Sequence, residues 1–157
     1  MPCCPTSLAF KKQVSFGFKY GKLAAISRNA HDYYFNTDPD PDWLLSDEEI
    51  FLYLDDDIAV SKDIAQDAPF HIVIWFMECS VRNVLETKDR YPEKFEKVMN
   101  SIKKIREYLG LEELKVWFTE REAGQHHSHI QVTSGESEVQ SSEDLYRKIR
   151  LFFKEHY

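Results

Sequence analysis

The stretch FHIVIWFM, residues 70–77, is the most apolar segment of this 157-residue chain, and our expectation of the fold starts from it. Seven of its eight residues are apolar, three of them β-branched and three aromatic. A short run with one polar residue, His71, is typical of a strand buried on both faces, with that histidine hydrogen bonded inside. A helix that continues to Leu85 also fits the apolar spacing, but the β-branched and aromatic content favours the strand.

Composition limits the class of protein. Hydrophobic residues make up 43% of the chain and aromatic residues 14%, which is enough to form one domain with a core. No apolar run approaches the roughly 18 residues that cross a bilayer, and the start of the chain lacks the pattern of a secretory signal. Three cysteines do not suggest a disulfide framework. We therefore expect a cytoplasmic protein with no membrane partner.

Apolar spacing also predicts the order of the elements. We expect two strands, a short helix, the central strand, a helix, two more strands and a final helix. The short helix begins at Asp47, after a capping box of Ser46 and Glu49, and Ser61–Gln66 adds a further turn. The long helix opens at Pro92 and ends before Gly110. The expected strand and helix ranges are 13–20, 23–26, 47–54, 70–77, 92–109, 114–120, 127–133 and 141–157.

This β-β-α-β-α-β-β-α order predicts an α+β fold. A crossover followed by a hairpin forms a mixed or antiparallel sheet, with helices packed on one face as a two-layer sandwich. We find no internal repeat and no domain boundary, so we expect a single domain over 1–157. Residues 36–68 are expected to form an acidic insert of helix and loop at one end of the sheet.

The charge distribution suggests a first function. The net charge of the chain is −7, but residues 36–68 alone carry eleven acidic residues and one lysine, a net −10. This block is either an ordinary solvated surface or an electronegative face that steers a basic protein partner into contact. Its aspartates do not have the spacing of an EF-hand loop. The partner-binding residues would be Trp43, Asp47, Glu48, Asp55, Asp56 and Asp57.

The sequence His126-His127-Ser128-His129 suggests a second function. Because side chains alternate along a strand, His127 and His129 share one face, and that spacing can chelate one divalent metal such as Mn or Zn. Glu120, at the end of the preceding strand, is the candidate third ligand. The alternative is that a polar strand face beside a turn simply contains histidines.

Residues 119–132 resemble the metal-binding hairpin of the His-hydrophobic-His nucleases, which are the conjugative relaxases and rolling-circle replication initiators. The predicted strand-helix-strand-strand-helix order also resembles their core. The resemblance implies a metal-dependent phosphodiesterase with Tyr33 or Tyr34 as nucleophile in the relaxase arrangement, or Tyr146 in the initiator arrangement. Ser128 departs from the pattern, which has an apolar residue there, and a third histidine ligand is not evident.

The chain has no Gly-rich phosphate loop and no G-x-S-x-G elbow. The lack of a coherent catalytic set and the acidic block favour a protein without enzymatic activity and without a cofactor. We therefore expect a protein-binding module of the inhibitor or immunity-protein kind, or a dedicated chaperone for a basic protein. The alternative is the metal-dependent phosphodiesterase or nuclease, whose partner would be a nucleic acid.

Overall fold

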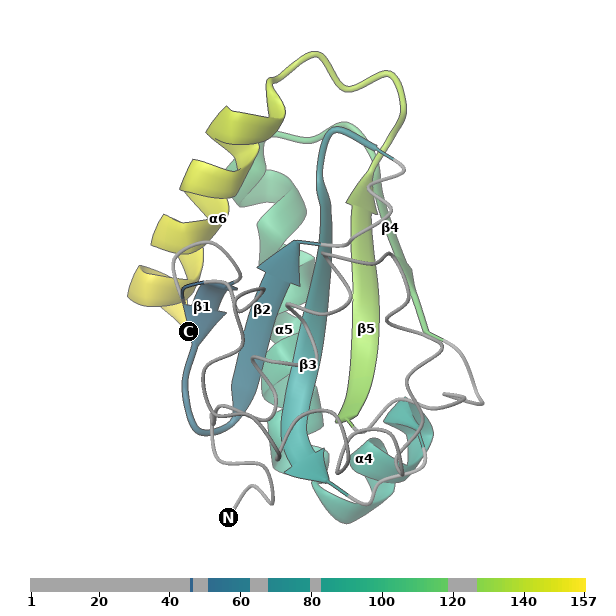
Figure 1. Cartoon of the computed structure of the whole chain (residues 1–157). Helices are drawn as coiled ribbons and strands as arrows, with labels where there is room; N and C mark the ends of the chain where they lie inside the picture. Colours follow the sequence, from purple (N-terminus) through teal and green to yellow (C-terminus); the bar gives the residue numbers. More distant parts are fainter. Residues whose placement is uncertain (1–45, 47–50, 63–67, 80–82, 119–126) are drawn as a thin grey trace.

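The computed structural model describes residues 46, 51–62, 68–79, 83–118 and 127–157, with Cys79 and His127 described by their backbone alone. Figure 1 shows a sheet with α5 and α6 on one face. No helix among the described residues is long and apolar enough to cross a membrane. In chain order the elements are β1 (Phe51–Leu54), β2 (Ile58–Lys62), β3 (His71–Cys79), α4 (Val84–Arg90), α5 (Pro92–Leu109), β4 (Leu114–Trp117), β5 (His127–Ser134) and α6 (Ser142–His156).

The predicted α+β class is confirmed, with an antiparallel sheet. Its five described strands lie in the order β1-β2-β3-β5-β4, and every neighbouring pair is antiparallel. The helical connection after β3 carries the chain past one strand position before β4 begins. Strand β5 then returns into that position, so it pairs with both β3 and β4. For this reason the described sheet contains no parallel pair, although the predicted crossover is present.

The central strand is β3, as the stretch 70–77 predicts, and the helix alternative is wrong. Every side chain from His71 to Glu78 is buried. The side chains of Ile72, Ile74 and Phe76 enter the core cluster that also holds the buried residues of α5 and α6. The alternating residues, among them His71 and Trp75, are only 2% and 1% exposed on the opposite face. Both faces of the strand are therefore buried, as expected from its composition.

The two long helices confirm the predictions made from apolar spacing. Helix α5 has proline at its first position and ends at Gly110, whose φ of 68° is the left-handed conformation that glycine adopts without strain. Ser141 caps α6 by accepting a hydrogen bond from the backbone N of Asp144 at 3.2 Å. The inward stripe of α6 is buried as predicted and comprises Leu145, Ile149, Phe152 and Phe153.

The first two described strands correct the expectation of an acidic helix. Residues 51–54 form β1 rather than helix, and Ser61 belongs to β2 rather than to a helical turn. The cause is the turn between them, where Asp55 Oδ1 accepts hydrogen bonds from the backbone N of Asp57 at 2.7 Å and of Ile58 at 2.8 Å. This Asx turn reverses the chain and lets the strands pair. The predicted hairpin over 13–26 and residues 47–50 lie outside the described residues.

Candidate functional site

The face of β5 that points away from the helices carries the candidate site. Ile130 and Val132 are 0% exposed in the core, so the alternating residues His129 and Gln131 project to the opposite face, where both are half-buried. The prediction of strand structure over 127–133 is confirmed. Sequence alternation anticipated that His129 and Gln131 would share a face, but it gave no partner for either residue.

Gln131 is held by a histidine from the neighbouring strand. The Nε2 of His71 lies 2.5 Å from Oε1 of Gln131, although 60 residues separate them in the sequence. An amide oxygen only accepts hydrogen bonds, so His71 donates from Nε2. The amide nitrogen of Gln131 makes no hydrogen bond with any described residue. Its two N–H groups therefore remain as donors on the face of β5 that also carries His129.

The imidazole of His129 lies against a buried indole. Its ring centroid is 4.6 Å from that of Trp75, with 38° between the ring planes, and the two residues are register partners across β3 and β5. The indole is fixed in turn, because Trp75 Nε1 donates a hydrogen bond to Ser61 Oγ at 2.9 Å. Aromatic contacts of this kind are worth about 0.5–1.5 kcal/mol beyond their buried area. The rigid indole positions His129 on the sheet.

The edge strand β4 adds an aromatic surface and a cation to this face. The ring of Trp117 lies 5.6 Å from that of His71 and is 38% exposed. Lys115 precedes it by two residues and is the register partner of Thr133 on β5. Its ion pair with Glu113 is long, at 4.0 Å, and exposed, so it contributes little to stability and leaves the ammonium able to bind a ligand. We define the β5 site as His71, Lys115, Trp117, His129 and Gln131.

Ser128 faces the other way and ties the strand of the site to a helix. Its Oγ lies 2.6 Å from Oγ1 of Thr87 in α4, and both residues are 0% exposed. This hydrogen bond explains why a hydroxyl stands where the nuclease pattern has an apolar side chain. Paired hydroxyl groups can be buried, whereas a single one without a partner is costly.

The structure tests the nuclease residues only in part. Among the described residues, no group of three or more His, Cys, Asp and Glu side chains is placed to hold a metal ion. Tyr146 is 5% exposed on the helix side of the sheet, where its hydroxyl bonds the backbone of His71 at 3.2 and 3.3 Å, so it is not beside His129. Six of the predicted site residues lie outside the described ranges, namely Tyr33, Tyr34, Trp43, Asp47, Glu48 and Glu120.

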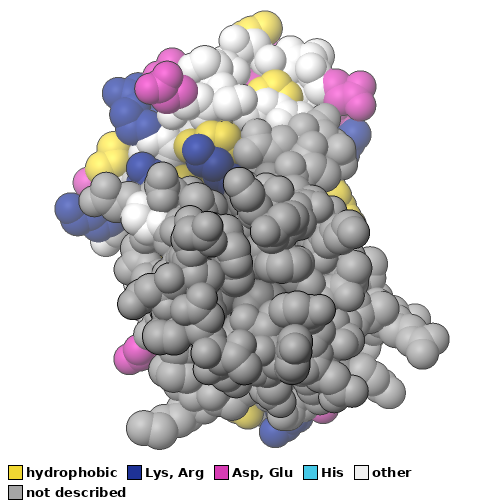
Figure 2. Space-filling model, in the orientation of Figure 1, with side chains coloured by type: hydrophobic (Ala, Val, Ile, Leu, Met, Phe, Trp, Pro, Cys, Tyr) yellow, Lys and Arg dark blue, Asp and Glu magenta, His cyan; other side chains and the backbone are white. Residues whose placement is uncertain are grey.

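The described aspartates of the acidic block largely serve the fold. The carboxylate of Asp55 accepts the two backbone bonds of the β1–β2 turn and also the hydroxyl of Tyr53 at 2.7 Å. Asp57 pairs with Lys94 at 3.0 Å, and the same ammonium bonds the buried Glu78. Among the described aspartates of the block, Asp56 is exposed, whereas Asp55 and Asp57 are half-buried. On the described part of the surface in Figure 2, acidic and basic side chains are interspersed.

No family model matches the chain, and no curated protein matches it. Solved structures match part of the chain at low sequence identity and with TM-scores below 0.5. A Hit-like protein involved in cell-cycle regulation from Bartonella henselae is 22% identical, with a TM-score of 0.48 over 66% of this chain and 85% of that chain. A hypothetical histidine triad nucleotide-binding protein from Sulfolobus tokodaii is 19% identical, with a TM-score of 0.49 over 66% and 83%. A HIT family hydrolase from Clostridium thermocellum is 23% identical, with a TM-score of 0.46 over 59% and 84%.

These structures contradict the hypothesis of a protein-binding inhibitor, immunity protein or chaperone. The solved structures that match part of the chain are named for the histidine triad, for nucleotide binding and for hydrolysis. The expectation of a basic protein partner is therefore wrong. The physical reason is that a block of negative charge in a sequence does not say whether its carboxylates are free. Here Asp55 accepts hydrogen bonds of the β1–β2 turn and Asp57 is paired with Lys94.

Proposed function

We propose that the β5 site binds the phosphate group of a nucleotide and that its histidines support hydrolysis of a phosphate ester or anhydride. The observation that carries the proposal is the Gln131 amide, which His71 holds through its oxygen and whose nitrogen makes no hydrogen bond with any described residue. Binding a phosphate requires several hydrogen-bond donors that converge on one anion.

The donors of the site suit a phosphate group. Gln131 offers amide N–H groups and Lys115 offers an ammonium, on the face where the ring of His129 lies against Trp75. The side chain of His127, the other histidine of the pair predicted from the sequence, lies outside what the structure describes. An imidazole can donate or accept a proton near neutral pH, so a pair of histidines can serve as acid and base in the same reaction.

The chemistry that we propose is transfer of a phosphoryl group to water. The oxygen of water bonds to phosphorus as the bond from phosphorus to the leaving oxygen breaks. One imidazole takes the proton of the water, and a protonated imidazole gives a proton to the leaving oxygen.

The exposed ring of Trp117 supplies a surface for the base of a nucleotide. Bases stack on aromatic side chains with little dependence on sequence, and each such contact is worth about 1–3 kcal/mol. Trp117 lies on the strand next to β5 and is the register partner of Gln131. A nucleotide with its base on Trp117 and its phosphate at Gln131 and His129 would therefore use adjacent residues. A cytoplasmic location, where such ligands occur, belongs to this proposal.

The names of the structural neighbours, which include nucleotide binding and hydrolysis, determine which ligands to try first. The experiment follows AMP and ADP by phosphorus NMR in the presence of the wild type, the variant His129→Ala and the control Lys103→Ala, an exposed change on α5. We expect line broadening of AMP and release of phosphate from ADP with the wild type and the control, and at least a tenfold slower release with His129→Ala. Equal release by all three proteins would contradict the proposal.

A further inference from the structure

Basic residues gather in the middle of the two long helices that cover the sheet. Residues 97–106 of α5 and 145–154 of α6 each contain four lysine or arginine residues and no acidic residue. The whole chain, by contrast, has 27 acidic residues against 20 basic ones. The acidic residues of these helices lie nearer their ends and are Glu93, Glu96, Glu107, Glu143, Asp144 and Glu155. A local excess of cations in an acidic chain indicates a surface for an anionic ligand.

The packing of the helices brings the two basic segments together. They run antiparallel, because Gln140 Nε2 bonds the carbonyl O of Leu109 at 3.0 Å near one end, while Lys97 lies 4.1 Å from the ring centroid of Tyr157 near the other. The middle of α5 therefore lies beside the middle of α6, as Figure 1 shows.

The cations of α5 divide between its two sides. Lys104 lines a cavity that α5 shares with α6, and Lys97 lies two turns before it on the same side. Arg106 lies on the other side, where its Nη1 bonds the carbonyl O of Glu112 at 3.4 Å, just before β4. Lys103 precedes Arg106 by three residues and so shares the β4 side. Lys97 and Lys104 are the cations of α5 that face α6.

The exposed side of α6 carries three further cations. Arg147, Arg150 and Lys154 are exposed and are spaced by three and four residues, so they share one side of the helix. Arg147 bonds Asp144 at 3.0 Å, but both side chains are largely exposed, so the pair is weak and the guanidinium can still bind an anion. Lys148 is bonded to a glutamine oxygen at 2.6 Å and is set aside. We define the basic band as Lys97, Lys104, Arg147, Arg150 and Lys154.

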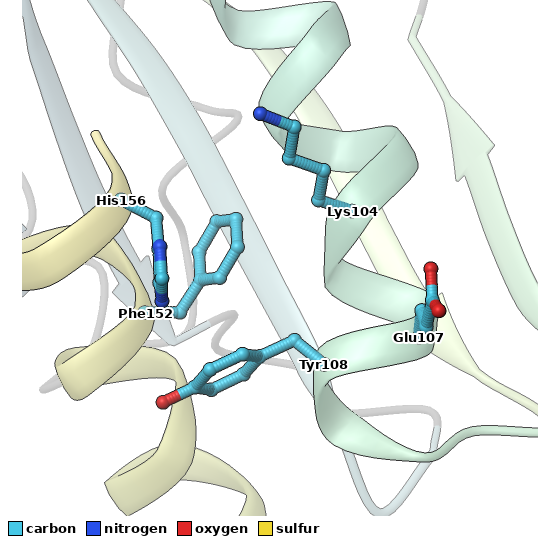
Figure 3. Close-up of a pocket in the computed structure, with 5 residues that line it drawn as sticks. All are labelled: Lys104, Glu107, Tyr108, Phe152 and His156. Atoms are coloured by element: carbon cyan, nitrogen blue, oxygen red, sulfur yellow. The ribbon is translucent and has the colours of Figure 1, made fainter.

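An aromatic cavity opens beside the basic band. It has a volume of about 240 Å³ and is lined by Lys104, Glu107, Tyr108, Phe152 and His156. Figure 3 shows the ring of Tyr108 reaching from α5 toward α6, the Lys104 side chain on the Phe152 side, and the Glu107 carboxylate turned away from Phe152 and His156. Lys104 forms no ion pair with any described residue. The charge beside the aromatic surface is therefore a cation.

Tyr108 offers a fixed ring to a ligand. It is 38% exposed, whereas Phe152 is 1% exposed and closes the bottom of the cavity. The ring centroid of Tyr108 is 5.2 Å from that of Phe152 and 5.4 Å from that of His156, so the ring is already held before a ligand arrives. The bases of nucleic acids stack on exposed aromatic rings with little dependence on sequence. Cations that follow the backbone, together with such a ring, are what proteins use to bind single strands.

We propose that the outer face of α5 and α6 binds single-stranded nucleic acid. The phosphates lie along the basic band, and one unpaired base stacks on Tyr108. A membrane surface would supply the negative charge but no base. The surface lies on the helix side of the sheet, opposite the β5 site, and does not depend on the function proposed for that site.

The experiment measures binding of the full chain to a fluorescent strand of twelve thymidine nucleotides by anisotropy. A strand of twelve abasic sites has the same phosphates without bases, and we expect it to bind about tenfold more weakly. Affinity for the thymidine strand should fall about twentyfold between about 50 and 200 mM salt, as for neutralisation of about three phosphates. A uridine strand is titrated beside it, and the tighter of the two identifies DNA or RNA as the ligand.

Exposed substitutions test the charges. Lys104→Gln and Lys154→Gln should each weaken the thymidine strand about fivefold. Lys103→Gln removes the same charge from the β4 side of α5 and is the matched control, which should bind as the wild type does.

Substitutions of Tyr108 test the stacked base. Tyr108→Leu should weaken the thymidine strand about tenfold and leave the abasic strand unchanged. Tyr108→Phe keeps the ring and should bind both strands as the wild type does. Because each variant is titrated with both strands, a general loss of folding is distinguished from the loss of one stacked base.

The β5 site is separated by competition. Saturating AMP should leave the affinity for the thymidine strand unchanged, and displacement by AMP would place the strand at the β5 site and overturn the proposal. Three other results would overturn it. They are equal affinity for the thymidine and abasic strands, equal losses in Lys103→Gln and Lys104→Gln, and binding to vesicles of phosphatidylcholine and phosphatidylserine without binding to either strand.

Discussion

Replacing Thr87 by valine removes the hydroxyl that bonds Ser128 in the strand of the β5 site. The two oxygens are 2.6 Å apart and both residues are 0% exposed, so water cannot replace the lost partner. A buried polar group left without a partner costs about 1–3 kcal/mol. The backbone is spared, because the carbonyl of Asn83 keeps its bond from the Thr87 amide at 3.1 Å. We therefore expect the free energy of unfolding to fall by about 2 kcal/mol.

A double-mutant cycle isolates the pair. Ser128→Ala leaves the Thr87 hydroxyl with its longer bond to the Asn83 carbonyl at 3.3 Å, so it should cost less, about 1 kcal/mol. In the double variant both polar groups are gone, and the loss should be about that of Ser128→Ala alone. Urea unfolding followed by tryptophan fluorescence measures all four proteins. Losses that simply add in the double variant, or a loss below about 0.5 kcal/mol for Thr87→Val, would refute the reasoning.

Three further predictions concern stability. Lys94→Met leaves the buried carboxylate of Glu78 without its cation. We expect the free energy of unfolding in urea to fall by about 2 kcal/mol, which is below the range for a fully buried pair because Lys94 is one-third exposed. An unchanged unfolding midpoint would contradict this prediction. Burial and the hydrogen bond to Asp55 raise the pKa of Tyr53 to about 12, whereas an unfolded tyrosine ionises near pH 10. The protonated Tyr53 therefore stabilises the fold fully below about pH 10, and this contribution is lost as the pH rises toward 12. In unfolding measured as a function of pH, Tyr53→Phe should lose less stability between pH 10 and 12 than the wild type does. Gly110→Ala should lower the free energy of unfolding by about 1 kcal/mol. The cause would be backbone strain alone, because a Cβ at this position meets nothing within 4 Å. An unchanged thermal unfolding temperature would argue against the strain.

The sequence predicted the elements whose pattern is long or dense. The stripe from Pro92 to Leu109 spans five helical turns, so its period is clear. The stretch 70–77 is too apolar to lie anywhere but the core. The capping box of Ser46 and Glu49 predicts that Phe51–Leu54 is helical, yet four residues are too few to establish a period. Its pairing with β2 depends on the side-chain bonds of Asp55, which local propensity does not describe.

The sequence predicts only the part of the candidate site that lies on a single strand. Alternation along β5 placed His129 and Gln131 on one face without knowledge of the fold. The contact of Gln131 with His71 requires the pairing of β3 with β5 across 60 residues, and no local pattern encodes that register. A local pattern also cannot show whether a carboxylate is paired, which explains the wrong prediction that the acidic block binds a basic protein. Whether Asp57 is free or paired depends on Lys94, which comes from a different element.

The most direct test of the proposed phosphate site compares the wild type with Gln131→Glu. Isothermal titration calorimetry measures the affinity of each protein for AMP and for adenosine, which lacks the phosphate. The substitution keeps the oxygen that accepts the His71 bond, so the strand pairing is retained, but it replaces the amide donor by a negative charge. We predict that AMP binds the wild type at least tenfold more tightly than adenosine, and that Gln131→Glu abolishes this preference. Equal binding of AMP to both proteins, or no preference for AMP over adenosine in the wild type, would contradict the account.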